Sequence, residues 1–281
     1  MSSLAPPVEQ SQSSPEKTSG PAIRFQDVSM AFEKQVLDGV SFQLKHGETK
    51  VLLGESGTGK TLILKLALGL IKPDSGAITV LGEEISAMRE QDMYALRRRI
   101  GMVFQESALF DSLTVEENVA YRLMEETGQL TDEIHARVLE ALEFVELGQT
   151  FSLFPGELSG GMRRRVAIAR AIITQPEVLL YDSPTGGLDP VTSNTIIELV
   201  VKQRDVYKTS SLLVTHRLQD AFTMASHYFD RKLNKMVPLE DGSARNVHTT
   251  FVILRDRKII FEGRAPELLR CHDPCIREYL S

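Results

Sequence analysis

The stretch "VLLGESGTGKT" (51–61) decides the fold, because it fits the pattern G-x-x-x-x-G-K-[ST] in full. A short apolar run precedes its glycines, and residues at helical spacing follow them, which is the context that the pattern requires. In such a loop the backbone amides point at phosphate oxygens, and the helix that follows adds its positive N-terminal end. The stretch therefore predicts a phosphate-binding loop between a buried strand and a helix.

Two side chains of this loop carry specific chemistry. Lys60 is placed to reach the β- and γ-phosphates of a nucleotide, and Thr61 offers its hydroxyl to magnesium. A glycine-rich turn with an incidental lysine is the alternative, and the agreement of pattern and context argues against it. The residues that we expect to hold the nucleotide here are Gly54, Glu55, Ser56, Gly57, Thr58, Gly59, Lys60 and Thr61.

The rest of the chain alternates strand and helix patterns. Near-alternating apolar residues predict antiparallel, half-exposed strands over 22–32 and 35–44. Continuous apolar runs predict buried strands, and helical patterns between the later ones favour a parallel sheet. The buried strands are expected at 49–54, 100–104, 177–182 and 211–215, with helices at about 161–174, 190–206 and 218–225.

Four regions are expected along the chain. Residues 1–21 are rich in Ser, Pro and Gln and lack an apolar signal-peptide segment, so we interpret them as a disordered tail. Residues 22–281 show no internal repeat and are expected to form one nucleotide-binding domain. Within it, helical periodicity predicts an all-helical subdomain at about 106–160. The polar stretch 230–250 is expected to be an exposed loop insert, with a docking surface as the alternative.

The composition excludes several classes of protein. A hydrophobic content of 42% supports a folded core, and a net charge of −6 argues against non-specific nucleic-acid binding. No apolar run reaches the roughly 18 residues of a membrane span. Cys271 and Cys275 flank His272, but structural zinc needs about four ligands, so we expect no metal there. Two thiols in a chain of this length suit a reducing compartment.

Three further motifs are each weak alone. "ELSGGMRRR" (157–165) places a second amide-rich anion site at a helix start. The apolar strand "EVLLYD" ends in Asp182, which suits magnesium, and the apolar strand "LLVTH" ends in His216. Taken singly, a capped helix and two core strands with polar last residues are the favoured explanations. The candidate residues at the helix start are Ser159, Gly160 and Gly161.

In this order the motifs resemble those of the ATP-binding-cassette (ABC) ATPases, over about residues 22–281. The resemblance implies an α/β fold, a P-loop NTPase of ABC type, with a mixed-sheet RecA-like core, an N-terminal antiparallel β part and an all-helical subdomain. It implies ATP and Mg²⁺ as cofactors, with Thr61, Gln105 of "VFQ" and Asp182 at the metal. The nucleotide contacts that it adds to the loop are Phe32, Ser159, Gly160, Gly161 and Asp189 of "GLDP".

The resemblance also implies partners. In the family the signature motif of one subunit closes over the ATP held by the other, so Ser159 and Gly161 are expected to act on a second ABC ATPase subunit, in a homodimer. Because the chain shows no membrane span, a transmembrane permease must be another chain, and contact with the membrane runs only through it. The expected location is the cytoplasm, at the inner face of the cell membrane.

A narrower resemblance concerns the branch of the family. "LSGGMRRRVAIARAI" carries Met162 where most relatives have Gln, and the ending "DPCIREYL" (273–280) is similar to that of the lipid-asymmetry (Mla) and organic-solvent-resistance branch. The branch implies phospholipid transport. An ATPase of a small-solute importer is the alternative.

One residue departs from the family pattern. In "LLYDSPTGGLDP" (179–190), Ser183 stands where the family has the glutamate that activates water. A serine hydroxyl is a very weak base, whereas a general base contributes about 10²–10⁴-fold to a rate. We therefore expect slow hydrolysis with His216, Ser183 and Gln105 as the catalytic candidates. A non-hydrolysing, ATP-gated regulatory cassette is the alternative.

Overall fold

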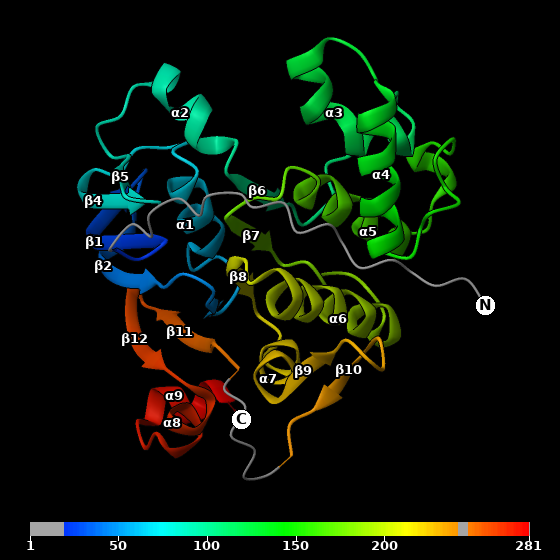
Figure 1. Ribbon diagram of the computed structural model, residues 1–281. Coiled ribbons are helices and arrows are strands. Elements are labelled where there is room, and N and C mark those ends of the chain that lie inside the picture. Colours follow the sequence, from blue (N-terminus) through cyan, green and yellow to red (C-terminus); the bar gives the residue numbers. More distant parts are fainter. Residues whose placement is uncertain (1–19, 241–246, 281) are drawn as a thin grey trace.

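The computed structural model describes residues 20–240 and 247–280 (Figure 1). The tail predicted over residues 1–21 lies outside this part of the chain, apart from its last two residues.

An antiparallel sheet forms the N-terminal part of the fold. Alternate residues of β1 and β2 are buried, as in a sheet that turns one face to solvent. Phe25 and Phe42 pair across these strands and stack with their ring centroids 4.7 Å apart. The antiparallel, half-exposed strands predicted here are confirmed. In spatial order the sheet contains β2 (Gln35–Leu44), β1 (Ile23–Ala31), β4 (Ser75–Val80) and β5 (Glu83–Glu84).

A second sheet of six strands forms the core. Its strands pair in parallel, except that β12 at one edge pairs antiparallel with β11, so the sheet is mixed. Every residue of β3, β7 and β8 is buried, as their continuous apolar runs predict. The predicted α/β fold with a mixed-sheet core is confirmed. The spatial order is β12 (Lys258–Gly263), β11 (Thr249–Arg255), β3 (Thr49–Leu53), β8 (Ser210–Thr215), β7 (Val178–Asp182) and β6 (Ile100–Val103).

Helices connect these strands and cover the core. The helices after β3, β7 and β8 each begin close to the carboxyl end of the preceding strand, so polar residues gather at that edge of the sheet. The helices outside the helical subdomain are α1 (Lys60–Ala67), α2 (Glu90–Arg97), α5 (Gly160–Ile172), α6 (Pro190–Tyr207), α7 (Leu218–Ser226), α8 (Ala265–Arg270) and α9 (Pro274–Leu280).

Two capped helices project from the core beside α5 (Figure 1). They are α3 (Val115–Thr127) and α4 (Asp132–Phe144), and a short 3₁₀ turn, η1 (Pro155–Glu157), leads back toward α5. Thr114 forms a capping box with Glu117, and the Thr131 side chain accepts a hydrogen bond from the Ile134 amide. These elements lie in the region for which the helical subdomain is predicted.

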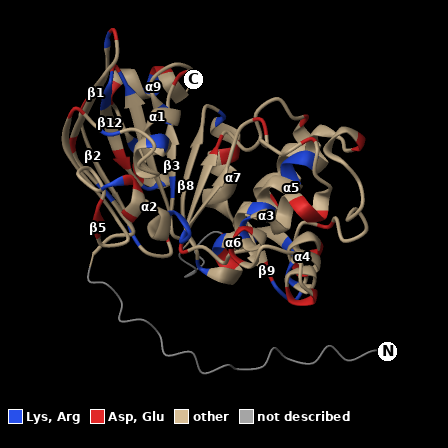
Figure 2. Ribbon diagram, turned by 90° about the horizontal axis from the view of Figure 1, so that it is seen from above, with Lys and Arg blue, Asp and Glu red and all other residues tan. Residues whose placement is uncertain are grey.

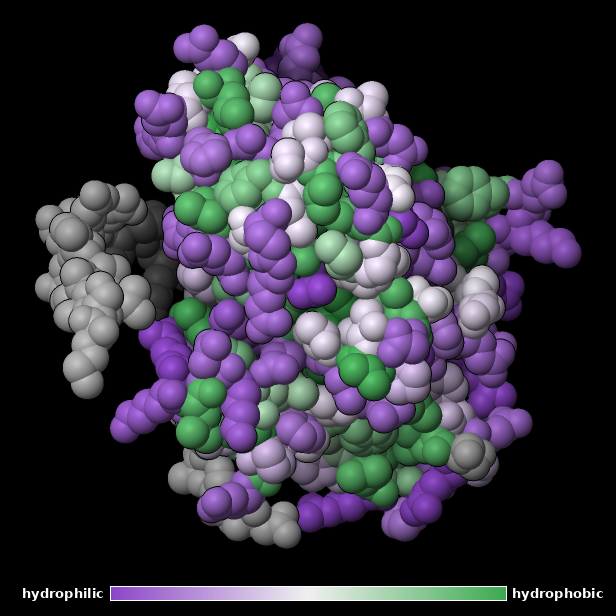
Figure 3. All heavy atoms as spheres, turned by 90° about the vertical axis from the view of Figure 1, so that its right-hand side faces the viewer, coloured by the Kyte–Doolittle hydropathy of each residue, from purple (hydrophilic) through white to green (hydrophobic). Residues whose placement is uncertain are grey.

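The surface is mixed in charge and in hydropathy. Lys and Arg are interspersed with Asp and Glu (Figure 2), and over most of the face on the right of Figure 1 hydrophobic side chains lie among hydrophilic ones (Figure 3). Within residues 20–240 and 247–280, no helix has both the length and the apolar character needed to cross a membrane.

The expected loop at 230–250 contains a strand. β9 (His227–Asp230) and β10 (Lys235–Pro238) form an antiparallel hairpin against α6, and residues 241–246 lie outside the described part. The hairpin packs on the core through two apolar side chains, a buried Phe229 and a partly buried Met236. The residues around them are mostly polar, so the sequence pattern does not indicate a strand there. Two carboxylates of α6 also accept hydrogen bonds from hairpin amides, 2.8 Å from Phe229 N to Asp205 and 2.6 Å from Met236 N to Glu198.

Candidate nucleotide site

One cavity of about 360 Å³ is lined by eight of the residues expected at the nucleotide. It lies at the carboxyl ends of the parallel strands, where polar groups of separate loops converge. The expected residues that line it are Ser56, Gly57, Gly59, Lys60, Thr61, Gln105, Ser183 and His216.

The loop ahead of α1 has the backbone shape that phosphate binding needs. Gly59 caps α1 at φ 99°, and a Cβ there would lie 2.9 Å from Val36 Cγ1, so only glycine fits. A Cβ on Gly54 would lie 2.5 Å from the Leu254 carbonyl oxygen. These two contacts explain why the loop requires glycine at both ends of its turn.

Lys60 is held inside the loop. Its Nζ donates to the carbonyl oxygens of Gly54 and Glu55, at 2.9 and 2.7 Å. Burial lowers the pKa of the Lys60 ammonium, and the charges of Asp182 and Glu55 oppose that shift. A cation that is drawn out of water and bound only to neutral carbonyls is well placed to exchange them for phosphate oxygens.

Oxygen donors for magnesium lie next to the lysine. The Thr61 hydroxyl donates to Asp182 Oδ1 at 3.1 Å, which joins α1 to the end of β7. Burial raises the pKa of the Asp182 carboxyl, while the Thr61 bond and the charge of Lys60 lower it. A hydroxyl at the start of α1 and a carboxylate at the end of β7 fit a hard cation such as Mg²⁺, which would neutralise phosphate charge.

Ser183 stands in a constrained turn. Its side chain is 8% exposed and lines the cavity, and its backbone has φ 44°, in the left-handed region. Its amide donates to the Val214 carbonyl at 2.8 Å, and its carbonyl accepts from the Gly186 amide at 2.9 Å. The position is therefore fixed relative to β8, but its side chain offers only a hydroxyl.

Gln105 and His216 reach the same cavity from two further strands. Gln105 lies just beyond the end of β6, and His216 directly follows β8. Both side chains are exposed toward solvent. An amide and an imidazole at these places can position water or a phosphate oxygen.

The structure does not bring the remaining candidates into this cavity. Phe32 is 63% exposed in the bend directly after β1. Ser159 caps α5 by accepting from the Met162 amide at 3.2 Å, and Asp189 caps α6 by accepting from the Val191 and Thr192 amides at 3.0 Å. The expected residues outside the cavity lining are Phe32, Gly54, Glu55, Thr58, Ser159, Gly160, Gly161, Asp182 and Asp189.

Arg164 is a site residue that the sequence analysis missed. It is buried in α5, and its guanidinium donates to the carbonyls of Phe104, Ser183 and Gly186, at 3.2, 3.4 and 3.3 Å. Its position in the sequence could have revealed it, because residues 164, 168 and 171 lie on the same buried face of the helix. A charged residue on an apolar stripe indicates a buried polar partner.

A second network holds the other side of the Ser183 turn. The Thr185 hydroxyl donates to the buried Asp220 carboxylate. Arg217 donates to the Thr185 carbonyl at 3.2 Å and to the Ser193 hydroxyl at 2.7 Å. These bonds tie the turn after β7 to the residues that follow β8, so Ser183 and His216 share one support.

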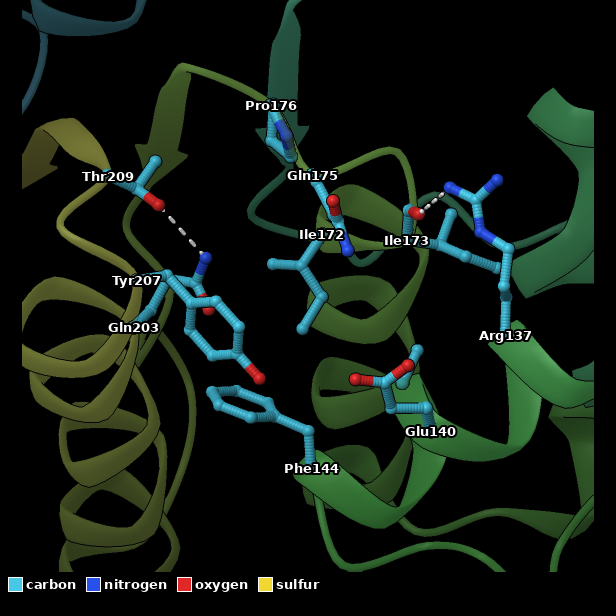
Figure 4. A pocket seen from close by; sticks show the side chains of 11 residues that line it. Arg137, Glu140, Phe144, Ile172, Ile173, Gln175, Pro176, Gln203, Tyr207 and Thr209 are labelled. Carbon is cyan, nitrogen blue, oxygen red and sulfur yellow. Dashed lines mark hydrogen bonds between the residues drawn. The ribbon is translucent and has the colours of Figure 1, made fainter. Parts of the chain in front are cut away.

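Another cavity, of about 270 Å³, contains none of the expected site residues (Figure 4). Figure 4 shows Gln203 with its amide directed at Thr209, a hydrogen bond of 3.1 Å, while Glu140 of α4 and Tyr207 of α6 face each other. Its lining offers a carboxylate, apolar surface and the Arg137 guanidinium, which donates to the Ile173 carbonyl at 2.8 Å. Among the described residues this lining has no turn of backbone amides, so it does not suit a nucleotide phosphate.

Comparison with known proteins agrees with this geometry. The family model described as ABC transporter matches residues 37–186. An intermembrane phospholipid transport system ATP-binding protein, MlaF of Escherichia coli (strain K12), is 34% identical over 88% of this chain and 83% of its own length. The Arabidopsis thaliana protein TRIGALACTOSYLDIACYLGLYCEROL 3, chloroplastic, is 35% identical over 95% and 75%. A probable ribonucleotide transport ATP-binding protein, mkl of Mycobacterium leprae, is 32% identical over 93% and 69%.

Solved structures show the same fold. A dimeric bacterial ABC transporter cassette, MJ0796, superposes with a TM-score of 0.71 and 27% identity, over 86% of this chain and 98% of that one. A post-hydrolysis state of the same cassette, bound to ADP and phosphate, gives the same values.

Lys60→Ala should weaken Mg-ATP binding by roughly 10-fold to 100-fold, because it removes hydrogen bonds from a charged donor to the phosphates. Isothermal titration calorimetry measures this, with Lys72→Ala, an exposed lysine beyond α1, as the control of equal charge. Unchanged affinity in Lys60→Ala would show that the phosphates bind elsewhere.

Proposed function

The chain belongs to the ABC transporter family, as an ATP-binding subunit with ATPase activity, and from this premise we propose that it hydrolyses ATP slowly to drive phospholipid transport by a separate membrane permease. The observation that carries the proposal is the single cavity in which Lys60, Gln105, Ser183 and His216 meet, beside the Thr61–Asp182 pair. Phospholipid as the cargo is supported by the name of the E. coli relative.

Slow hydrolysis follows from the groups present. Phosphoryl transfer depends mainly on positioning and on neutralising charge, which the loop amides, Lys60 and Mg²⁺ held by Thr61 and Asp182 supply. The missing base accounts for about 10²–10⁴-fold, or about 3–5 kcal/mol of barrier. His216 lines the same cavity and is the group best placed to hold water against the γ-phosphate.

A dimer explains why the start of α5 lies outside the cavity. Ser159 and Gly160 are exposed at the start of α5, where the helix presents free amides and the positive end of its dipole. Such a group binds phosphate, yet it does not line the chain's own cavity. We infer that it completes the nucleotide site of a second copy.

A groove between the core and α3 suits the permease. Its cavity of about 360 Å³ is mainly apolar, and several large apolar side chains around it are exposed. Arg122 Nη2 is buried there without a hydrogen-bond partner in the described residues, so the occupant should bring an acceptor. Arg170 donates to Ser107 and Ala108 carbonyls, both at 2.8 Å, which links the groove to the segment after Gln105. The exposed apolar residues that line it are Leu70, Phe104, Phe110 and Tyr121.

A permease segment with apolar side chains and a carboxylate fits this groove. Through the permease the chain would lie at the cytoplasmic face of the cell membrane. A ribonucleotide is the alternative cargo, since the M. leprae relative is named for ribonucleotide transport. Transport measured in vesicles that contain the purified permease distinguishes lipid from nucleotide cargo.

Ser159→Arg should block ATP-dependent dimerisation and leave ATP binding by the monomer intact, since the substitution places a bulky cation at the proposed interface. Light scattering with and without Mg-ATP measures the dimer. Gln129→Arg adds the same charge on an exposed loop and should dimerise normally. A full-strength dimer in Ser159→Arg would contradict the assignment of the signature to the partner's site.

Leu70→Arg should reduce co-purification of the permease at least about 10-fold, because an arginine cannot be desolvated in an apolar groove without a partner. Leu70 is 53% exposed, and Leu269 of α8 is 60% exposed, so Leu269→Arg is a matched control. Both variants should bind ATP normally. Equal recovery of a membrane-spanning protein with both variants would place the permease elsewhere.

Ser183→Glu should raise the hydrolysis rate at least about 10-fold, because it restores a carboxylate at a fixed turn that lines the cavity. ATP affinity should hardly change, since a base acts mainly in the transition state. Phosphate release at saturating Mg-ATP measures the rate, and Ser183→Gln controls for size without basicity. If Ser183→Glu is no faster than the wild type, another group already activates the water, and His216→Ala becomes the decisive variant.

A further inference from the structure

Arg164 connects two parts of the molecule that serve different nucleotide sites. It lies in α5, the helix whose first residues carry the signature that we assign to the partner's ATP. Its guanidinium, however, donates to carbonyls around the chain's own cavity, those of Phe104, Ser183 and Gly186. Phe104 directly precedes Gln105, and Ser183 stands at the water-activating position.

The bonding of Arg164 is incomplete in this state. The side chain is 5% exposed, and it forms no ion pair with any residue in 20–240 or 247–280. Its Nε is buried and has no hydrogen-bond partner there. Burial lowers the pKa of the guanidinium, and only the more distant charges of Glu106 and Asp182 counter this. A buried cation that is bound to neutral carbonyls alone is costly, so its position is sensitive to small shifts of those carbonyls.

The two functions are close enough to move together. Five residues separate Ser159 from Arg164, which is roughly 7–8 Å along a helix. Because a helix held by its own hydrogen bonds moves as a rigid body, a displacement of its first turn reaches Arg164 almost undiminished. Other hydrogen bonds hold the turn from the side away from Arg164. They run from Thr185 to Asp220 and from Ser183 N to Val214 O, the latter at 2.8 Å, and they fix the turn while Arg164 moves.

We propose that Arg164 is a positioning residue that makes each nucleotide site respond to closure of the other. When α5 closes on the partner's ATP, Arg164 shifts the carbonyls of Phe104, Ser183 and Gly186, and this sets Gln105 and residue 183 around the chain's own ATP. The inference rests on the dimer of the proposed function.

Amide hydrogen exchange of the peptide segments that contain Gln105 and Ser183 tests the link in the full-length chain. The comparison uses wild type, Arg164→Gln and Arg165→Gln, each with and without Mg-ATP, and light scattering monitors the dimer. Arg165 is the neighbouring arginine and also donates to a carbonyl, Val145 O at 3.1 Å, but on the side of α4. It therefore matches the change of charge and the loss of a bond.

Arg164 bonds to the carbonyls of the turn, so its loss destabilises the turn in which the amides of Ser183 and Gly186 are themselves hydrogen-bonded. Without nucleotide, these two amides should therefore exchange at least about 10-fold faster in Arg164→Gln than in the wild type, as expected on losing a hydrogen bond from a charged donor. With Mg-ATP, exchange at 183–188 should slow in the wild type and in Arg165→Gln. In Arg164→Gln it should stay fast although the dimer forms. Arg164→Lys should restore part of the slowing, since an ammonium keeps the charge but spans fewer carbonyls.

Three outcomes would overturn the proposal: equal protection of 183–188 in the Arg164→Gln dimer and the wild-type dimer, an equal loss in Arg165→Gln, or no recovery in Arg164→Lys. If the wild type forms no dimer with ATP, the dimer of the proposed function is refuted. The comparison without nucleotide then still tests whether Arg164 holds the turn at 183–186. If Arg164→Gln does not fold, Arg164→Lys carries the comparison, and wild-type protection in its nucleotide-free and ATP-bound states would refute the role.

Discussion

Parallel pairing of β3 with β8 and of β8 with β7 is the constraint on which the rest of the structure depends. These strands are buried along their whole length, and Asp182, Ser183 and His216 lie at or just beyond the carboxyl ends of β7 and β8. Register then aligns those ends, with Leu53 opposite Thr215 and Asp182 opposite Val214. The loop 54–61, the Asp182 carboxylate, Ser183 and His216 thus meet at one edge, although the loop precedes the other three by more than a hundred residues in the chain.

Buried hydrogen bonds hold the loops at that edge. Arg164 spans three carbonyls, and Asp220 with Arg217 holds the turn from the other side. Such bonds are directional, and a buried cation without a carboxylate beside it depends on all of them. A site supported in this way can change its geometry when one support moves, which a close-packed apolar core resists.

Ser183 stands where the family pattern has a glutamate, and this replacement affects ATP binding and ATP hydrolysis differently. In the proposed function, the groups assigned to phosphate and metal are all present, while residue 183 has no carboxylate to take a proton in the transition state. The loss therefore falls on the rate and spares affinity.

The sequence by itself determined the family of folds, the two sheets and the chemical types of the site residues, because strand burial and glycine-rich turns are local properties of short segments. Only the tertiary structure decided which of those residues meet. It placed Lys60, Gln105, Ser183 and His216 in one cavity, left Ser159 and Phe32 outside it, and found a hairpin in place of a polar loop. It also disclosed Arg164, whose partners lie 60, 19 and 22 residues away in the chain. Periodicity shows that a residue is buried, but the atoms that it meets there depend on how distant segments converge.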